Sequence, residues 1–343
     1  MKTIFKYSKK FIKQYFYYSG KSTKELERFL ENSEPNRLLH TLSIFLFGLT
    51  LYYNSSKINN EINKFIDKSN KEVKTNRYEI KTNFNYWWFL ICFIHDIGYA
   101  YNEKFTDFEL FQKNSESEIK EEVKSILKNI SDFSKDCIPE VIIDSWEKYL
   151  EFKENSKDSK IKEKIDHGIL SGAYYIYTLN KVFEEKSINN TKRVDRNGGF
   201  TDENKLYWSK KMIDCVHKPI AWIIAAHNIW YKNLNYENTN EYDKEDLKEL
   251  IIEEPLVKLE KYPLYFLLCL VDTLDPIKYL MKTTDKFSNL KINEVLEDIV
   301  CNINDDYIEI KFKDALKSYN EGYSQKNSKI DNWMDIKILN NKV

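Results

Sequence analysis

An almost wholly apolar stretch, FNYWWFLICFIHDIGYAY at residues 84–101, constrains this chain most, because His95 and Asp96 stand side by side in its interior. An aspartate is seldom buried in an apolar helix unless another group pairs with it or a metal ion coordinates it. A capped helix end or a satisfied polar pair in the core is the alternative interpretation. The stretch predicts a central helix with a polar centre.

The composition of the chain is that of an ordinary globular protein, with 343 residues, 42% of them hydrophobic and 31% charged. A net charge of −1 provides no overall field that would recruit nucleic acid or an anionic membrane. The five cysteines are scattered and form no C-x-x-C pair, which argues against a disulfide scaffold or a zinc ribbon. No uncharged apolar run reaches the roughly 18–20 residues of a membrane span. We therefore expect a cytoplasmic protein without a membrane span.

Helical spacing of apolar residues recurs along the chain. In residues 37–53 one face carries four residues at this spacing, which directs a histidine toward the core: His40, Ile44, Phe47 and Leu51. Further apolar helices are predicted over residues 165–183, 219–232 and 262–280, with His227 two turns inside the second of them. The pattern predicts a mainly α fold.

The C-terminal part changes character. Residues 306–312 and 332–339 alternate apolar and polar side chains with the period of strands, and a short helical segment separates them. We therefore expect a small C-terminal α/β appendage, over residues 285–343, on a helical domain that covers residues 35–284. A charged segment at about 102–164 is expected to be a surface helical insertion, either a lid or an oligomer contact.

The N-terminal arm, residues 1–34, is basic and aromatic. Its first thirty residues carry eight lysines and arginines against two glutamates. Contact with a membrane surface or a nucleic-acid backbone is one interpretation. An amphipathic helix that packs its aromatic face on the domain is the favoured one.

Histidine is rare and unevenly placed. Four of the five histidines, and two aspartates with them, fall within or at the start of apolar helical segments: His40, His95, Asp96, His167, His227 and Asp272. The fifth histidine, His217, is the least committed. Clustering of these residue types in the core helices is what a shared metal site requires.

The order His, His-Asp, His, His, Asp resembles the HD superfamily of metal-dependent phosphohydrolases. The matching segments are RLLH (37–40), HDIGY (95–99), DHGILSGA (166–173), AAHN (225–228) and LVDTLDP (270–276). The resemblance covers about residues 35–280 and implies an HD-type helical bundle. No GYP-type signature follows the third segment, so the cyclic-di-GMP-specific branch is not supported.

The resemblance implies one or two divalent metal ions. One ion would be held by His40, His95, Asp96 and Asp272, and Asp96 would bridge to a second ion held by His167 and His227. Mixed imidazole and carboxylate ligands suit Mn, Fe, Co, Ni or Zn better than an all-oxygen magnesium site.

The implied reaction is hydrolysis of a phosphate ester or phosphoanhydride by a metal-activated water, and the substrate expected first is a nucleotide. Besides Asp96, Asp166 is a candidate catalytic residue, either orienting His167 or carrying a proton. The candidate substrate-binding residues are Arg37, Tyr99, Asn228, Lys278, Arg193 and Arg196. Ordinary packing or solvated loop charge is the alternative for each of them.

Two other functions stay open. A metal nuclease, as in CRISPR-associated HD proteins, would use the basic arm to guide a single strand of nucleic acid, although the near-neutral net charge weighs against it. A non-catalytic sensor would use the metal pocket to bind a nucleotide. The partner expected first is a small phosphorylated substrate, and a homo-oligomer is left open.

Overall fold

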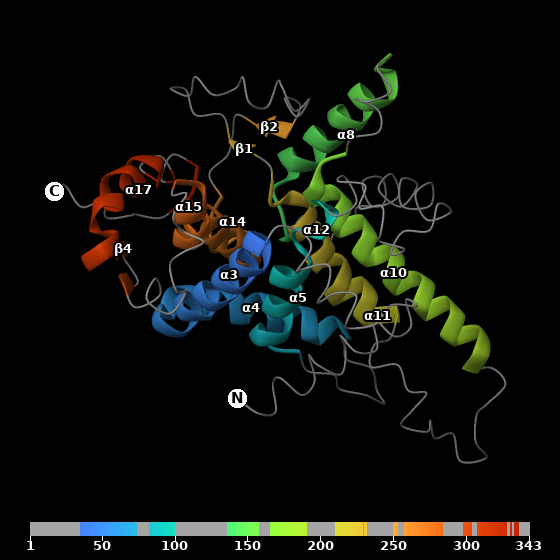
Figure 1. Ribbon diagram of the computed structural model, residues 1–343. Helices are drawn as coiled ribbons and strands as arrows, with labels where there is room; N and C mark the ends of the chain where they lie inside the picture. The colour runs from blue at the N-terminus through green and yellow to red at the C-terminus, as the bar shows by residue number, and fades with distance from the viewer. Residues whose placement is uncertain are drawn as a thin grey trace.

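The structure is a computed structural model that describes residues 35–73, 82–99, 136–157, 165–190, 210–228, 230–231, 250–252, 257–283, 298–303, 307–327, 330 and 333–335. It is mainly helical, with a small two-stranded sheet near the C-terminus, which confirms the mainly α prediction (Figure 1). The basic N-terminal arm, residues 1–34, lies outside the described residues. No helix in the described part of the chain is both long and apolar enough to cross a membrane.

The helices follow one another along the chain, joined in one place by a π-helical turn. They are α3 (Pro35–Asn54), α4 (Ser56–Val73), α5 (Phe84–Ile94), α8 (Glu140–Asn155), α10 (His167–Asn190), α11 (Lys210–Met212), the π-helix η2 (Ile213–His217), α12 (Lys218–Ala226), α14 (Pro263–Leu274), α15 (Pro276–Thr283), the 3₁₀-helix η5 (Asp314–Tyr319) and α17 (Asn320–Asn327). Two strands of two residues each, β1 (Trp230–Tyr231) and β2 (Ile251–Ile252), pair in parallel.

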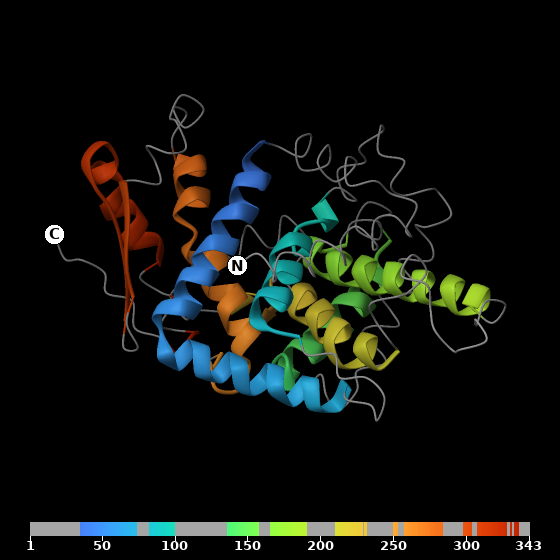
Figure 2. The ribbon, with the colours of Figure 1, turned by 90° about the horizontal axis from the view of Figure 1, so that it is seen from below.

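The centre of the molecule consists of three strongly apolar helices, α5, α12 and α14, which contact one another. Because they are apolar on nearly every side, they must be covered by neighbours rather than by water. α4 is amphipathic and buries one face, whereas α10 packs along α12. Figure 2 shows α3 crossing between α15 and α5 while α4 runs along one edge.

Two of the predicted central helices end earlier than the sequence pattern suggests. α5 stops at Ile94, before the Gly98 at which the sequence allowed it to end, so that His95 is its C-cap and residues 95–97 form a turn. α12 stops at Ala226, so that His227 is the C-cap and not a residue two turns inside a helix. In each case the histidine ring binds a carbonyl of the last turn, where helix carbonyls lack partners.

The segment expected to be a surface insertion also contributes to the main core. Of residues 102–164 the structure describes 136–157, which contain α8. The inner face of α8 is fully buried through Ile142, Trp146 and Tyr149. These side chains belong to the same core cluster as those of α5 and α12. The described part of the segment is therefore part of the helical domain's packing.

The C-terminal part corrects one strand prediction. The predicted strand at 306–312 is confirmed as β4 (Ile308–Phe312), but its antiparallel partner is β3 (Ile299–Ile303), which the sequence pattern did not indicate. In the predicted strand 332–339, Met334 forms only an isolated bridge to Val257, and residues 336–339 lie outside the described part. Local alternation did not reveal which partner was available.

A second, smaller core joins this hairpin to the helical domain. Its buried side chains come from α15, β4, η5 and α17: Ile277, Tyr279, Leu280, Phe312, Leu316 and Tyr323. The Tyr323 hydroxyl also donates a hydrogen bond to the carbonyl of Leu274, the last residue of α14. The hairpin is thus attached to the helical domain through α15.

Candidate metal centre

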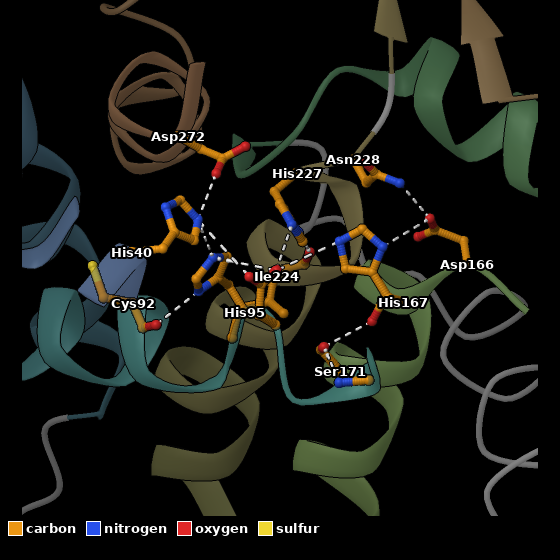
Figure 3. A network of polar contacts seen from close by, with 12 residues as sticks. His40, Cys92, His95, Asp166, His167, Ser171, Ile224, His227, Asn228 and Asp272 are labelled. Atoms are coloured by element: carbon orange, nitrogen blue, oxygen red, sulfur yellow. Dashed lines mark hydrogen bonds and ion pairs between the residues drawn. The ribbon is translucent and has the colours of Figure 1, made fainter. Parts of the chain in front are cut away.

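Six side chains predicted as metal ligands are brought together by five helices. His40 lies within α3, His95 and Asp96 follow the end of α5, His167 begins α10, His227 follows the end of α12, and Asp272 lies in α14. Figure 3 shows the four imidazole rings turned toward a common region, with Asp272 beside His40. Segments more than two hundred residues apart in the chain therefore meet at one place.

Asp96 is the shared member of this cluster. Its Oδ1 lies 3.3 Å from Nε2 of His95, 3.5 Å from Nε2 of His167 and 3.7 Å from Nε2 of His227. Its Oδ2 lies 3.8 Å from Nε2 of His40. The ligand atoms thus form two groups that share Asp96, one with His40 and His95 and the other with His167 and His227.

The cluster is buried except on the side of its carboxylates. The His95 side chain is fully buried, whereas the side chains of Asp96 and Asp272 remain 15% and 20% exposed. The other three imidazole side chains are 3–8% exposed, so solvent reaches the carboxylates more than the rings.

The rings of His95 and His227 are oriented by the same device. Nδ1 of His95 donates a hydrogen bond to the carbonyl of Cys92 at 2.7 Å, and Nδ1 of His227 donates to the carbonyl of Ile224 at 2.6 Å. Both acceptors lie three residues before the histidine, in the last turn of its helix. Because a carbonyl can only accept, Nδ1 carries the proton and Nε2 faces the cluster.

His40 is oriented by Asp275, to which the sequence analysis assigned no role at the site. Nδ1 of His40 lies 2.6 Å from Oδ2 of Asp275, whose side chain is fully buried. Asp275 also caps α15, since Oδ1 accepts a hydrogen bond from the amide of Ile277 at 2.9 Å. An aspartate directly before a proline is a common helix start, and this was the available indication.

His167 is held through its surroundings. The Tyr99 ring stacks on the His167 ring with the centroids 3.8 Å apart, so Tyr99 lies at the cluster. The amide of Gly98 donates to Oγ of Ser171, which in turn donates to the carbonyl of His167. A Cβ at Gly98 would lie 2.1 Å from that carbonyl oxygen, so only glycine permits this approach of the two backbones.

Asp166 and Asn228, predicted as a catalytic and a substrate-binding residue, contact each other. Nδ2 of Asn228 donates to Oδ2 of Asp166 at 2.6 Å, and Oδ1 of Asp166 accepts from the amide of Ile169, which caps α10. Oδ2 of Asp166 lies 3.7 Å from Nδ1 of His167, beyond hydrogen-bonding distance. The pair therefore stands directly behind His167.

Lys278 contacts Asp272 rather than reaching away from the protein. Its Nζ lies 2.7 Å from Oδ1 of Asp272, the same oxygen that Nε2 of His40 approaches at 3.0 Å. Two nitrogen groups thus compete for one carboxylate oxygen. Asp272 accordingly lies beside His40 at the edge of the cluster, outside the two groups that share Asp96.

The side chains of three other predicted substrate-binding residues lie outside the described part of the chain. Arg37 lies in α3, but its side chain is outside the described part of the chain. Arg193 and Arg196 also lie outside the described residues.

The charges of the cluster balance within it. Burial raises the pKa of Asp96 and Asp272, but His95 beside Asp96 and Lys278 beside Asp272 outweigh burial and hold both pKa values well below the ordinary range. Burial and Lys278 lower the pKa of His40, yet the hydrogen bonds to Asp272 and Asp275 prevail and raise it to about 9. Burial lowers the pKa of His167 to about 4. Near pH 7 the metal-free cluster therefore holds an ionised Asp96 beside a neutral His167 and an ionised Asp272 beside a protonated His40.

The residues fit a divalent metal ion. Ligand atoms that each lie about 2.0–2.2 Å from one ion are about 3.3–3.5 Å apart in a tetrahedral arrangement. The separations between the imidazole Nε2 atoms and the Asp96 oxygens, 3.3–3.8 Å, fall at or slightly above that spacing. They are slightly longer than typical hydrogen bonds. Where Nδ1 holds the only proton of a ring, as the carbonyl contacts of His95 and His227 allow, the Nε2 lone pair and a carboxylate oxygen repel each other unless a proton or a cation lies between them. The described residues thus include groups that could hold a metal.

Comparison of the chain with protein-family models, with curated proteins and with solved structures finds no match. The resemblance to the HD superfamily therefore stays a prediction based on the five ordered segments. The geometry of the cluster is an observation independent of that resemblance.

Proposed function

We propose that this protein hydrolyses a phosphate ester or phosphoanhydride in a nucleotide or related small molecule, at a metal centre formed by the clustered histidines and aspartates. The observation that supports this most is that one carboxylate, Asp96, is shared by two groups of imidazole ligands. A bound metal pair supplies Lewis acidity toward a phosphoryl oxygen and makes water a stronger nucleophile near neutral pH.

The residues of the cluster would bind the metal, exclude water from one side and leave the other side open to the substrate. His40, His95, Asp96, His167 and His227 would hold the metal, with Asp272 as a further carboxylate beside His40. The buried rings would exclude water from the rear of the centre, which strengthens electrostatic interactions there. The partly exposed carboxylate side would admit the substrate.

Two predicted residues acquire more specific roles in this proposal. Lys278, bound to Asp272, would contribute a positive charge close to an incoming phosphate. Asp166, fixed by Asn228 and by the α10 amide, would support His167 as a positioning group rather than move a proton itself. Tyr99, Arg37, Arg193 and Arg196 remain proposed substrate contacts.

The test combines metal content with hydrolysis. Wild type, Asp96→Ala and Asp214→Ala are purified without added metal, and bound transition metals are measured by mass spectrometry. Asp214 of η2 pairs with Lys218 of α12, so Asp214→Ala is the same chemical change outside the cluster. We expect about two equivalents of metal in wild type and in Asp214→Ala, and a large loss in Asp96→Ala.

Each protein is then given nucleoside mono-, di- and triphosphates, bis(p-nitrophenyl) phosphate and a single-stranded oligonucleotide. We expect phosphate or nitrophenol release that falls at least about 100-fold in Asp96→Ala, as for loss of a principal catalytic group. Cleavage of the oligonucleotide alone would identify the nuclease instead. Stabilisation by a nucleotide that is never hydrolysed would identify the sensor. Absence of metal in wild type after reconstitution would refute the proposal.

A further inference from the structure

We propose that Asp275 is a positioning residue that makes the His40 side of the centre the tighter of two metal subsites; this inference rests on the metal binding in the proposed function. The two subsites share Asp96, so a difference between them must come from the other ligands and from the groups behind those ligands. His40 and His95 belong to the first subsite, and His167 and His227 belong to the second.

Asp275 is fixed so completely that it acts as a rigid support. Its Oδ2 accepts hydrogen bonds from Nδ1 of His40 at 2.6 Å and from the amide of Lys278 at 3.1 Å. Its Oδ1 accepts from the hydroxyl of Ser43 and from the amide of Ile277. The side chain is fully buried, and both oxygens are engaged, so Asp275 holds the ring without being a ligand itself.

No other described ring of the cluster has an equivalent partner. His95 and His227 donate to neutral backbone carbonyls. The carboxylate of Asp166 lies 3.7 Å from Nδ1 of His167, too far for a hydrogen bond. A full negative charge hydrogen-bonded to Nδ1 increases the electron density that Nε2 donates to a metal, whereas a carbonyl does so less. His40 is therefore the strongest imidazole donor of the cluster.

The first subsite also has an additional carboxylate. Oδ1 of Asp272 lies 3.0 Å from Nε2 of His40, the atom that faces the cluster. The second subsite has the rings of His167 and His227 and a share of Asp96, and no further carboxylate belongs to it among the described residues. The first ion to bind should thus occupy the His40 side, and the second should bind more weakly.

A purely structural role for Asp275, as the cap of α15, must be separated from this one. Asp275→Asn serves this purpose, because the amide oxygen of asparagine can still cap α15 while the charge is removed. Its NH2 group cannot accept the hydrogen bonds that the other carboxylate oxygen accepted, so the cost in stability must be measured against a matched variant. Asp166→Asn is the matched control, since Asp166 likewise caps a helix behind the second subsite.

The metal-free full-length proteins are titrated with Co²⁺, monitored by calorimetry and by the visible absorption of bound Co²⁺, with melting temperatures measured in parallel. We expect two phases in wild type. Both variants lose one accepting oxygen, so their melting temperatures without metal should fall by similar amounts. Asp275→Asn should in addition weaken the tight phase about 10–100-fold, and Asp166→Asn should leave that phase within about threefold of wild type.

Three results would overturn the inference. These are equal affinities in the two wild-type phases, an unchanged tight phase in Asp275→Asn, or the same weakening in Asp166→Asn. Each leaves Co²⁺ binding, and with it the proposed function, intact. Failure of wild type to bind Co²⁺ at all would overturn both proposals.

Discussion

His217 lies apart from the metal centre, buried within the π-helix η2 between two tyrosines. Its Nδ1 lies 2.6 Å from the hydroxyl of Tyr175, and its Nε2 lies 3.4 Å from the hydroxyl of Tyr86. The wide turn also leaves the carbonyl of Cys215 able to accept a hydrogen bond from Ser69 of α4. The least committed histidine of the sequence is thus a core residue with satisfied ring nitrogens.

The burial of His217 predicts a loss of stability in acid. Burial lowers its pKa from 6.5 to about 3, so between these pH values the unfolded chain binds a proton that the folded chain does not. The contribution is complete above pH 6.5 and is lost progressively as the pH falls toward 3. His217→Gln should therefore have a shallower fall in unfolding free energy than wild type, by up to about 1.4 kcal/mol per pH unit.

Urea denaturation of both metal-free proteins at about pH 7 and about pH 5 measures this difference. Other groups that titrate in this range, including those of the metal centre, contribute equally in wild type and His217→Gln, so their contributions cancel in the difference. Identical pH dependence in the two proteins would show that another group carries the acid sensitivity.

The candidate metal ligands could be predicted from the sequence, but the residues that orient those ligands could not. Six residues were singled out because histidine and aspartate were placed against an apolar background, and the structure brings these six together. Asp275 was missed because its role depends on contact with His40 across 235 positions of the chain. Asn228 was assigned to the substrate because the sequence does not show that its amide reaches Asp166.

At the scale of the elements, the junction of α5 and α10 sets the geometry of the second subsite. Gly98 follows α5 and abuts the first residue of α10, whose carbonyl oxygen would lie 2.1 Å from a new Cβ. Because this obstacle is backbone, a side chain there must push the two helices apart. Such a shift would move His167 relative to Asp96.

We therefore expect Gly98→Ala to destabilise the fold by about 1–3 kcal/mol and to lose the metal ion that His167 helps to hold. Gly322→Ala is the comparison, because its Cβ would meet the hydroxyl of Tyr279, in the second core away from the metal centre, at 2.3 Å. This control variant should lose a similar amount of stability, but its folded molecules should retain the metal. Melting temperature measures the loss of stability in both variants, and metal content per folded protein shows which variant has lost the ion. Equal metal retention in both variants would contradict a geometric role for Gly98.

At the scale of the whole molecule, the centre ties together helices from most of the described chain. Its residues come from α3, α10 and α14 and from the ends of α5 and α12, and such a site does not exist in the unfolded chain. Binding at about 100 times the dissociation constant should stabilise the fold by about 2.7 kcal/mol.

The expected result is a melting temperature at least about 5 °C higher with Co²⁺ than after chelation. Asp96→Ala should melt at the same temperature in both conditions. If the melting temperature of wild type does not depend on metal, the cluster is a hydrogen-bonded network of core residues that binds no metal.

The periodicity of apolar residues predicted the long apolar helices correctly. It did not predict which strands pair, because the partners are far apart in the sequence. The helices at 37–53 and 165–183 were predicted because buried faces repeat along them, and they are observed as α3 and α10. The strand at 332–339 was wrong in its described part because alternation does not identify a partner. The ends of α5 and α12 were misplaced because apolar residues continue past them.

Those two helix ends have an electrostatic consequence. The peptide dipoles of a helix add up to about half a negative charge at its C-terminus. α5 and α12 both end at the cluster, one residue before His95 and His227. Their last carbonyls thus direct negative potential at the same place from two directions, each favouring a nearby cation by about 0.3–1 kcal/mol. The N-terminus of α10, at His167, carries the opposite partial charge, so two helix ends at the cluster favour a cation and one opposes it.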